Sequence, residues 1–88
     1  MKNYYSKVND IVLTHSDMTI EDNQRVVYTR FERPRENGFD FAESTLPFCS
    51  FNKTYGFSED ELFELADYLR NNSLLIWDYA QKGGSHIA

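Results

Sequence analysis

The sequence predicts a single α+β domain, in which a three- or four-stranded antiparallel meander is followed by a C-terminal helical hairpin packed on one sheet face. Its length of 88 residues is that of one small domain. β-branched and aromatic residues dominate the chain before Gly56, whereas Leu, Glu, Asp and Ala dominate after it. Apolar residues at helical spacing then follow two serines that can each begin a helix.

Aromatic residues give this short chain enough apolar surface for a core without cross-links. Hydrophobic residues make up 41% of the chain and aromatic residues 16%. Cys49 is the single cysteine, so no internal disulfide can form. The N-terminal residues lack the apolar stretch of a signal peptide, and the longest apolar run, Leu74–Trp77, is too short to cross a bilayer. We therefore expect a cytoplasmic protein without a membrane segment.

The first strands are expected before residue 32. Residues 8–20 fit either a helical stripe or a strand, and the β-branched residues of Ile11–Thr14 favour the strand. Asp22-Asn23 then predicts a turn into Arg25–Phe31, the clearest strand in the chain.

A hairpin is expected around Asn37-Gly38, where two loop lengths lead to different faces. A loop of these two residues alone would turn Phe41 away from the face that carries Phe31. A three-residue loop beginning at Glu36 would place Phe39 and Phe41 on the face of Phe31. It also puts glycine where a type I turn with a bulge needs positive φ, so we favour this bulged loop.

The segment after the hairpin is expected to hold a short final strand and then the helices. Residues 46–51 form the strand, and residues 52–56 are a connector. Ser58 predicts an N-cap, and Glu61 completes a capping box with it. The apolar stripe of this first helix contains Leu62, Leu65, Ala66 and Leu69.

A second, short helix is expected to complete the hairpin. Asn71-Asn72 ends the first helix, Ser73 caps the second, and Gly83 stops it. Its apolar residues Leu74–Trp77 should be largely buried. Residues 84–88 are expected to form a flexible tail.

Cys49 and His15 are the two residues that could support catalysis. A nucleophilic cysteine needs a thiolate stabilised by a nearby imidazole. Cys49 lies between Phe48 and Phe51, and burial in such an apolar stretch raises the pKa of a thiol. We therefore expect a packed, inert cysteine and no catalytic or cofactor site. A small enzyme that uses Cys49 and His15 is the least favoured alternative.

Metal binding is also not expected. His15 and Asp17 are two residues apart, so on a strand they project from one face and could supply two ligands. Spacing places no third ligand beside them, and His86 lies in the tail.

The charge of the chain is unevenly distributed. Residues 1–35 carry six bases and five acids, for +1, whereas residues 36–88 carry three bases and nine acids, for −6. Asp60, Glu64 and Asp67 form an acidic stripe on the first helix. This stripe is either a docking surface for a basic partner or the solvated face of an amphipathic helix. The acidic balance argues against direct nucleic-acid binding.

Aromatic and arginine residues suggest a further partner surface. The chain has seven Phe, six Tyr and one Trp, more than a core of this size needs, so some should be exposed. Exposed tyrosine near arginine is typical of binding hot spots, which makes candidates of Tyr4, Tyr5, Tyr28, Arg33 and Arg35. The structural alternative is a core closed by tyrosines, with arginine stems laid over aromatic rings.

Four stretches resemble a group of short bacterial proteins that have no assigned activity, some of them carried on mobile elements. The stretches are Asp10–Asp17, Arg30–Pro34, Gly56–Leu62 and Tyr68–Ser73. The resemblance would span most of the chain, and it implies no activity, cofactor or site.

These observations favour a non-enzymatic protein-binding or regulatory accessory module, whose partner is another protein or a second copy of the chain. The alternative is an anti-defence inhibitor of phage or mobile-element type. It would set the acidic helix face against a nucleic-acid-binding enzyme.

Overall fold

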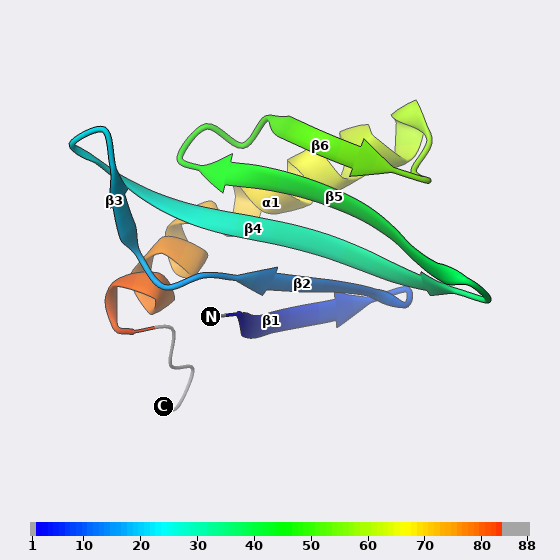
Figure 1. Ribbon diagram of the computed structural model, residues 1–88, viewed down its shortest axis with the longest axis horizontal. Coiled ribbons are helices and arrows are strands. Elements are labelled where there is room, and N and C mark those ends of the chain that lie inside the picture. The colour runs from blue at the N-terminus through cyan, green and yellow to red at the C-terminus, as the bar shows by residue number, and fades with distance from the viewer. Residues whose placement is uncertain (1, 84–88) are drawn as a thin grey trace.

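The computed structural model describes residues 2–83 and consists of one antiparallel sheet with a single long helix across one face (Figure 1). The predicted α+β class is confirmed. The elements are β1 (Asn3–Val8), β2 (Ile11–His15), β3 (Thr19–Glu21), β4 (Gln24–Arg35), β5 (Gly38–Leu46), β6 (Phe51–Tyr55) and α1 (Glu59–Gln81). The sheet has six strands instead of three or four, and one helix stands where a helical hairpin was predicted. The predicted tail and His86 lie outside the described residues.

Five strands follow the order β1-β2-β4-β5-β6, each antiparallel to its neighbour. β3 pairs with β4 beyond the end of β2, so β2 and β3 share one edge of the longest strand. Between them the Met18 N–H leaves the ladder and donates to the Ala80 carbonyl of α1 at 3.2 Å. The strand predicted over residues 8–20 is therefore present but interrupted.

Two tight turns, each with positive φ at both central residues, shape the first half of the sheet. Asn9 and Asp10 have φ values of 51° and 65°, and Asp22 and Asn23 have values of 50° and 66°. Asn and Asp tolerate this region, and such turns match the twist of a hairpin. The turn predicted at Asp22-Asn23 is confirmed. The same chemistry at Asn9-Asp10 adds β1, a strand that the sequence analysis missed.

The β4–β5 register differs from both predicted hairpins. Arg35 pairs with Gly38, so the loop consists of the two residues between them. Phe41 consequently pairs with Glu32, and Phe31 pairs with Ala42. A shift of one residue moves every side chain to the other face. The prediction that Phe39 and Phe41 share the face of Phe31 is therefore wrong, and Ala42 takes the core position.

The chain turns where a short last strand was predicted. The N–H groups of Phe48 and Cys49 both donate to the Thr45 carbonyl, at 3.0 and 3.1 Å. Pro47 has no N–H for a ladder, and Cys49 adopts a φ of 64°. The strand predicted over residues 46–51 is therefore wrong, and most of the predicted connector is strand β6.

The two ends of α1 lie where the sequence predicts them. Ser58 Oγ accepts the Glu61 N–H at 3.2 Å, and the Glu61 carboxylate accepts the Ser58 N–H at 2.9 Å. This is the predicted capping box. At the other end, Gly83 has a φ of 79° and its N–H donates to the Ala80 carbonyl.

The two helices predicted on either side of Asn72 are one continuous helix. Asn72 Nδ2 donates to the Tyr68 carbonyl at 2.8 Å, while Asn72 Oδ1 accepts the Tyr5 hydroxyl at 2.7 Å. Ser73 Oγ donates to the Arg70 carbonyl at 2.9 Å. The polar side chains expected to end one helix and cap another are thus bonded to the preceding turn and to β1, and the helix runs on.

The core lies between α1 and one face of the sheet. It contains Leu13, Val27, Phe31, Ala42, Leu46, Cys49, Leu65, Leu69, Ile76 and Ala80. The helical members recur at i, i+4, i+11 and i+15, so they form one straight stripe. In the described part of the chain, no element covers the opposite sheet face (Figure 1).

The substitution Leu69→Ala tests the one-sided packing of α1. Leu69 is fully buried, so its truncation is expected to lower the free energy of unfolding by about 2–5 kcal/mol. The matched control Leu74→Ala lies on the same helix at a position that is 85% exposed, and it should change stability by less than about 0.5 kcal/mol. Urea unfolding followed by circular dichroism measures both. Equal losses would contradict this packing.

Candidate functional site

Acidic and apolar side chains share the outer face of α1, which we define by Asp60, Phe63, Glu64, Asp67 and Leu74. All three carboxylates are exposed, as the helical spacing predicts. Phe63 is 72% exposed and Leu74 is 85% exposed. Phe63 and Leu74 are three turns apart on nearly the same line, about 16 Å along the axis at 1.5 Å per residue. These two exposed apolar side chains make the outer face of α1 a candidate interaction surface.

The exposure of Leu74 differs from the sequence prediction, whereas Phe63 was not singled out from the sequence. Leu74 belongs to the stretch expected to be buried in a second helix, and Leu75 beside it is also exposed. Because the helix is continuous, these positions turn away from the sheet. Phe63 lies outside the apolar stripe of the first helix, and this offset is the signal that could have identified it.

The helix carries the whole net charge of the protein. Six acids and one base lie in α1, for −5, and the other residues hold eight bases and eight acids, for zero. Asp67 forms an ion pair with Arg70, and Asp78 forms one with Lys82 at 3.0 Å. Both pairs are exposed, so they stabilise the fold little. Asp60 and Glu64 have no ion-pair partner within residues 2–83.

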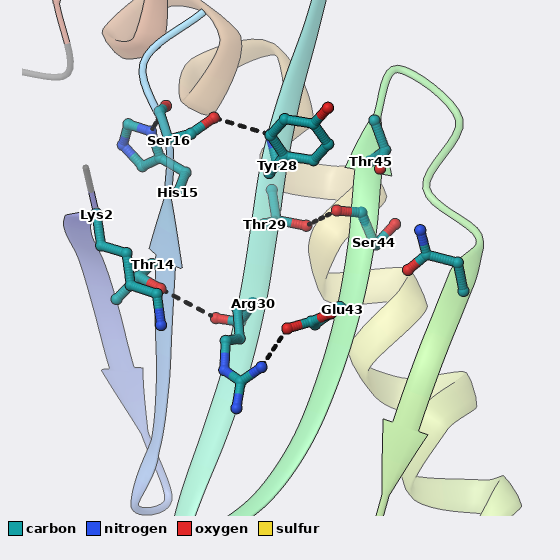
Figure 2. Close-up of a pocket in the computed structure, with 11 residues that line it drawn as sticks. Lys2, Thr14, His15, Ser16, Tyr28, Thr29, Arg30, Glu43, Ser44 and Thr45 are labelled. Carbon is teal, nitrogen blue, oxygen red and sulfur yellow. Dashed lines mark hydrogen bonds and ion pairs between the residues drawn. The ribbon is translucent and has the colours of Figure 1, made fainter.

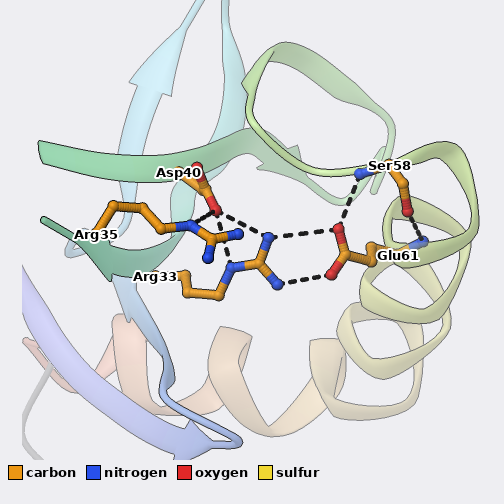
Figure 3. A network of polar contacts seen from close by, with 5 residues as sticks. All are labelled: Arg33, Arg35, Asp40, Ser58 and Glu61. Atoms are coloured by element: carbon orange, nitrogen blue, oxygen red, sulfur yellow. Dashed lines mark hydrogen bonds and ion pairs between the residues drawn. The ribbon is translucent and has the colours of Figure 1, made fainter. Parts of the chain in front are cut away.

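The N-terminus of α1 is attached to the β4–β5 hairpin by Arg33 (Figure 3). Arg33 Nη1 donates to Glu61 Oε2 at 2.6 Å, and Arg33 Nε donates to Asp40 Oδ2 at 2.9 Å. Arg35 Nε donates to the same Asp40 oxygen at 2.6 Å. The Arg33 guanidinium also lies 4.5 Å from the centre of the Phe57 ring. The two arginines proposed for a partner surface thus lie in this network of internal contacts.

The network shifts the ionisation of its carboxyl groups. The hydrogen bond from Arg33, followed by that from the Ser58 backbone, lowers the pKa of Glu61 to about 2. Burial of Asp40 opposes ionisation, but the hydrogen bonds from Arg33 and Arg35 outweigh it and hold the pKa of Asp40 below its usual value. The ionised forms are therefore part of the folded structure.

Gly56 leaves the space that Asp40 occupies. A Cβ atom at position 56 would lie 2.0 Å from Asp40 Oδ1, and the φ of Gly56 is 86°. Both the positive φ and the close approach require glycine here.

The open face of the sheet carries a shallow pocket of about 310 Å³, to which polar and charged residues contribute both polar groups and apolar carbon atoms (Figure 2). Tyr28, Arg30 and Thr45 contribute to its wall, together with Glu43. Arg30 forms ion pairs with Glu32 at 2.7 Å and with Glu43, and its guanidinium lies 4.4 Å from the centre of the Phe41 ring. Most of these residues lie outside the set singled out from the sequence.

The three tyrosines proposed for a partner surface lie in different environments. Tyr4 and Tyr28 are exposed on the open sheet face. Tyr5 is half buried against α1, where its hydroxyl donates to Asn72. Tyr5 also lies edge-on to the His15 ring, with centroids 6.4 Å apart.

Cys49 and His15 occupy different parts of the sheet. His15 is buried at the end of β2, with Nδ1 2.8 Å from the Ser16 carbonyl. Cys49 lies in the turn after β5, so β4 and β5 separate the two elements. Burial raises the pKa of the Cys49 thiol, and the charge of Arg70 opposes this only in part. A neutral thiol is a poor nucleophile.

The substitution Glu61→Gln tests the Arg33 network through its pH dependence. Because the folded pKa of Glu61 lies below its unfolded value of about 4.3, its stabilisation is present above that value and is lost as the pH falls toward about 2. In the wild type the urea midpoint should therefore fall between about pH 5 and pH 2. Glu61→Gln should lower it at pH 7 and flatten this dependence.

Glu64→Gln is the matched control, since Glu64 lies one turn away on the outer face. The urea midpoint of this variant should depend on pH as that of the wild type does. A midpoint that falls equally in the wild type and in Glu61→Gln would show that Glu61 does not contribute.

A pair of glycine substitutions tests the close approach of Gly56 to Asp40. Gly83→Ala has a similar φ and nothing within 4 Å of the added Cβ, so only the backbone penalty of about 1–2 kcal/mol is expected. Gly56→Ala adds the collision with Asp40 and should lower the free energy of unfolding further, as measured by urea titration. Equal effects would contradict the close contact.

Among residues 2–83, no cluster of three or more His, Cys, Asp or Glu side chains is placed to hold a metal ion. No helix in this range combines the length and apolar character needed to cross a membrane. Comparison of the chain with protein-family models, with curated proteins and with solved structures gives no match.

Proposed function

We propose that this chain is a non-catalytic protein-binding module of the cytoplasm that acts through the outer face of α1. The observation that carries the proposal is the exposure of Phe63 and Leu74 on the face that also bears Asp60, Glu64 and Asp67. A solvated helix face needs only polar side chains. Large apolar residues exposed on such a face are typical of the anchors of an interface.

The charge of α1 indicates the chemistry of the partner. Carboxylates around two apolar anchors fit a surface on which lysines or arginines surround apolar pockets. Asp60 and Glu64 are available to such a partner because no cation within the described residues pairs with them. Opposite charges would speed association and orient the complex, while the apolar anchors would supply most of the affinity.

The attachment of α1 to the sheet supports this role. Arg33 holds the first turn of the helix, and the bond between Tyr5 and Asn72 holds its middle. The anchors are therefore presented by a fixed helix, which lowers the entropy lost on binding.

A second candidate function is favoured by the concentration of the net charge on α1. A nucleic-acid-binding enzyme presents a basic groove to phosphate groups. The carboxylates of a rigid helix can occupy such a groove and exclude the nucleic acid. Added nucleic acid would displace an inhibitor of this kind from the enzyme. It would not displace a module that binds a different surface of its partner.

Affinity capture from the native host tests the proposal with two multiple variants. Phe63→Ser with Leu74→Ser removes the anchors, and each substitution should weaken binding by about 2 kcal/mol or more. The triple variant Asp60→Lys, Glu64→Lys, Asp67→Lys reverses the charge of the acidic stripe. It should abolish binding at low salt. The wild type should retain a stoichiometric protein.

The matched control is Ile20→Ser, which removes an equally exposed apolar side chain from β3. It should capture the partner as the wild type does. Circular dichroism should show that all variants are folded. Equal capture by the wild type and both α1 variants would refute the proposal.

A further inference from the structure

The pocket on the open sheet face is a second candidate binding site, distinct from the outer face of α1. Its floor is the backbone of β2, β4 and β5, and its rim is made of side chains that point away from the helix (Figure 2). Tyr28, Arg30, Glu43, Thr45 and Asn52 are the rim residues that carry the following steps. Its volume of about 310 Å³ is at the lower end of the range of small-molecule sites.

The charges around the pocket neutralise one another. Arg30 forms ion pairs with Glu32 and Glu43, and Lys2 lies 3.8 Å from Glu32. Two cations thus face two carboxylates. A strongly charged ligand would have to displace one of these partners, so the site favours a neutral ligand.

The rim still offers hydrogen bonds in several directions. The Tyr28 and Thr45 hydroxyls and the Asn52 amide make no side-chain hydrogen bond within residues 2–83. Arg30 has five N–H donors, of which the carboxylates occupy the one on Nε and one of the two on Nη1. Its ion pairs also hold the guanidinium in place. Hydrogen-bond donors and acceptors therefore lie on several sides of the pocket. They can reach more than one edge of a ligand.

The Tyr28 ring adds an apolar surface. It is 39% exposed and stands at the pocket beside Thr45 (Figure 2). A tyrosine presents an apolar ring and a polar hydroxyl to the same ligand. Lined by hydroxyls, an amide and an ion pair, the pocket suits a hydroxylated ligand better than a purely apolar one.

We propose that this pocket binds a neutral saccharide. A pyranose ring has hydroxyl groups around its edge that both donate and accept hydrogen bonds, and its C–H groups form an apolar face. The hydroxyls would bond to Arg30, Glu43, Thr45 and Asn52, and the C–H face would lie on Tyr28. A free sugar and the end of a glycan share this chemistry.

Titration of the ¹⁵N-labelled chain, followed by amide chemical shifts, tests the proposal. The probes are glucose, galactose and N-acetylglucosamine, with cellobiose, lactose and chitobiose as their linked forms. At least one sugar should give saturable shifts in residues 14–16, 28–30 and 43–45, with none at Phe63 or Leu74. Tighter binding of the disaccharides would indicate a glycan end, and equal binding a free sugar.

The variant Tyr28→Ala should weaken binding at least tenfold. Tyr4→Ala is the matched control, because Tyr4 is also exposed on the open sheet face but does not line the pocket. It should bind as the wild type does, and thermal unfolding should show both variants to be folded. Three results would overturn the proposal: no sugar gives saturable shifts, adenosine or uridine does so instead, or both variants lose binding equally.

Discussion

The packing of a single helical stripe against one face of the sheet is the interaction on which the rest of this structure depends. Leu65, Leu69, Ile76 and Ala80 of α1 meet Phe31, Ala42 and Leu46 of the sheet, and together they form most of the core. A chain of this length can build one such interface. Because the described residues contain one helix, its outer face and the opposite sheet face both remain open. The two surfaces proposed to bind follow from this geometry.

Polar contacts then fix how the helix lies on the sheet. Arg33 joins the capping box of α1 to Asp40 of β5, and Gly56 makes room for that carboxylate (Figure 3). Asn72 Oδ1 accepts a hydrogen bond from the hydroxyl of Tyr5 in β1. Helix packing by apolar contacts alone tolerates small shifts, whereas these bonds specify one position. The same bonds set the position of the outer face of α1 relative to the sheet.

The acidic residues of the chain have different roles in its two parts. Glu32, Asp40 and Glu43 in the sheet each form an ion pair with an arginine of β4, so the sheet is nearly neutral. On α1, Asp60 and Glu64 remain without such partners in the described range. The two open surfaces therefore differ in chemistry. This difference is why we propose a basic protein as the partner of the helix and a neutral hydroxylated ligand for the pocket.

Local signals in the sequence determined the α+β class, the ends of α1, the turn at Asp22-Asn23 and the acidic stripe. Each of these depends on residues within a few positions of one another. Tertiary structure alone decided the sheet register, since a shift of one residue at Gly38 exchanges the two faces. It also decided the continuity of α1, because the partner of Asn72 is Tyr5, 67 residues away. The exposure of Leu74 follows from the continuity of α1, and the pocket around Arg30 follows from the sheet register. Contacts between residues far apart in the sequence determine the register and the continuity of the helix. No short sequence pattern predicts such contacts.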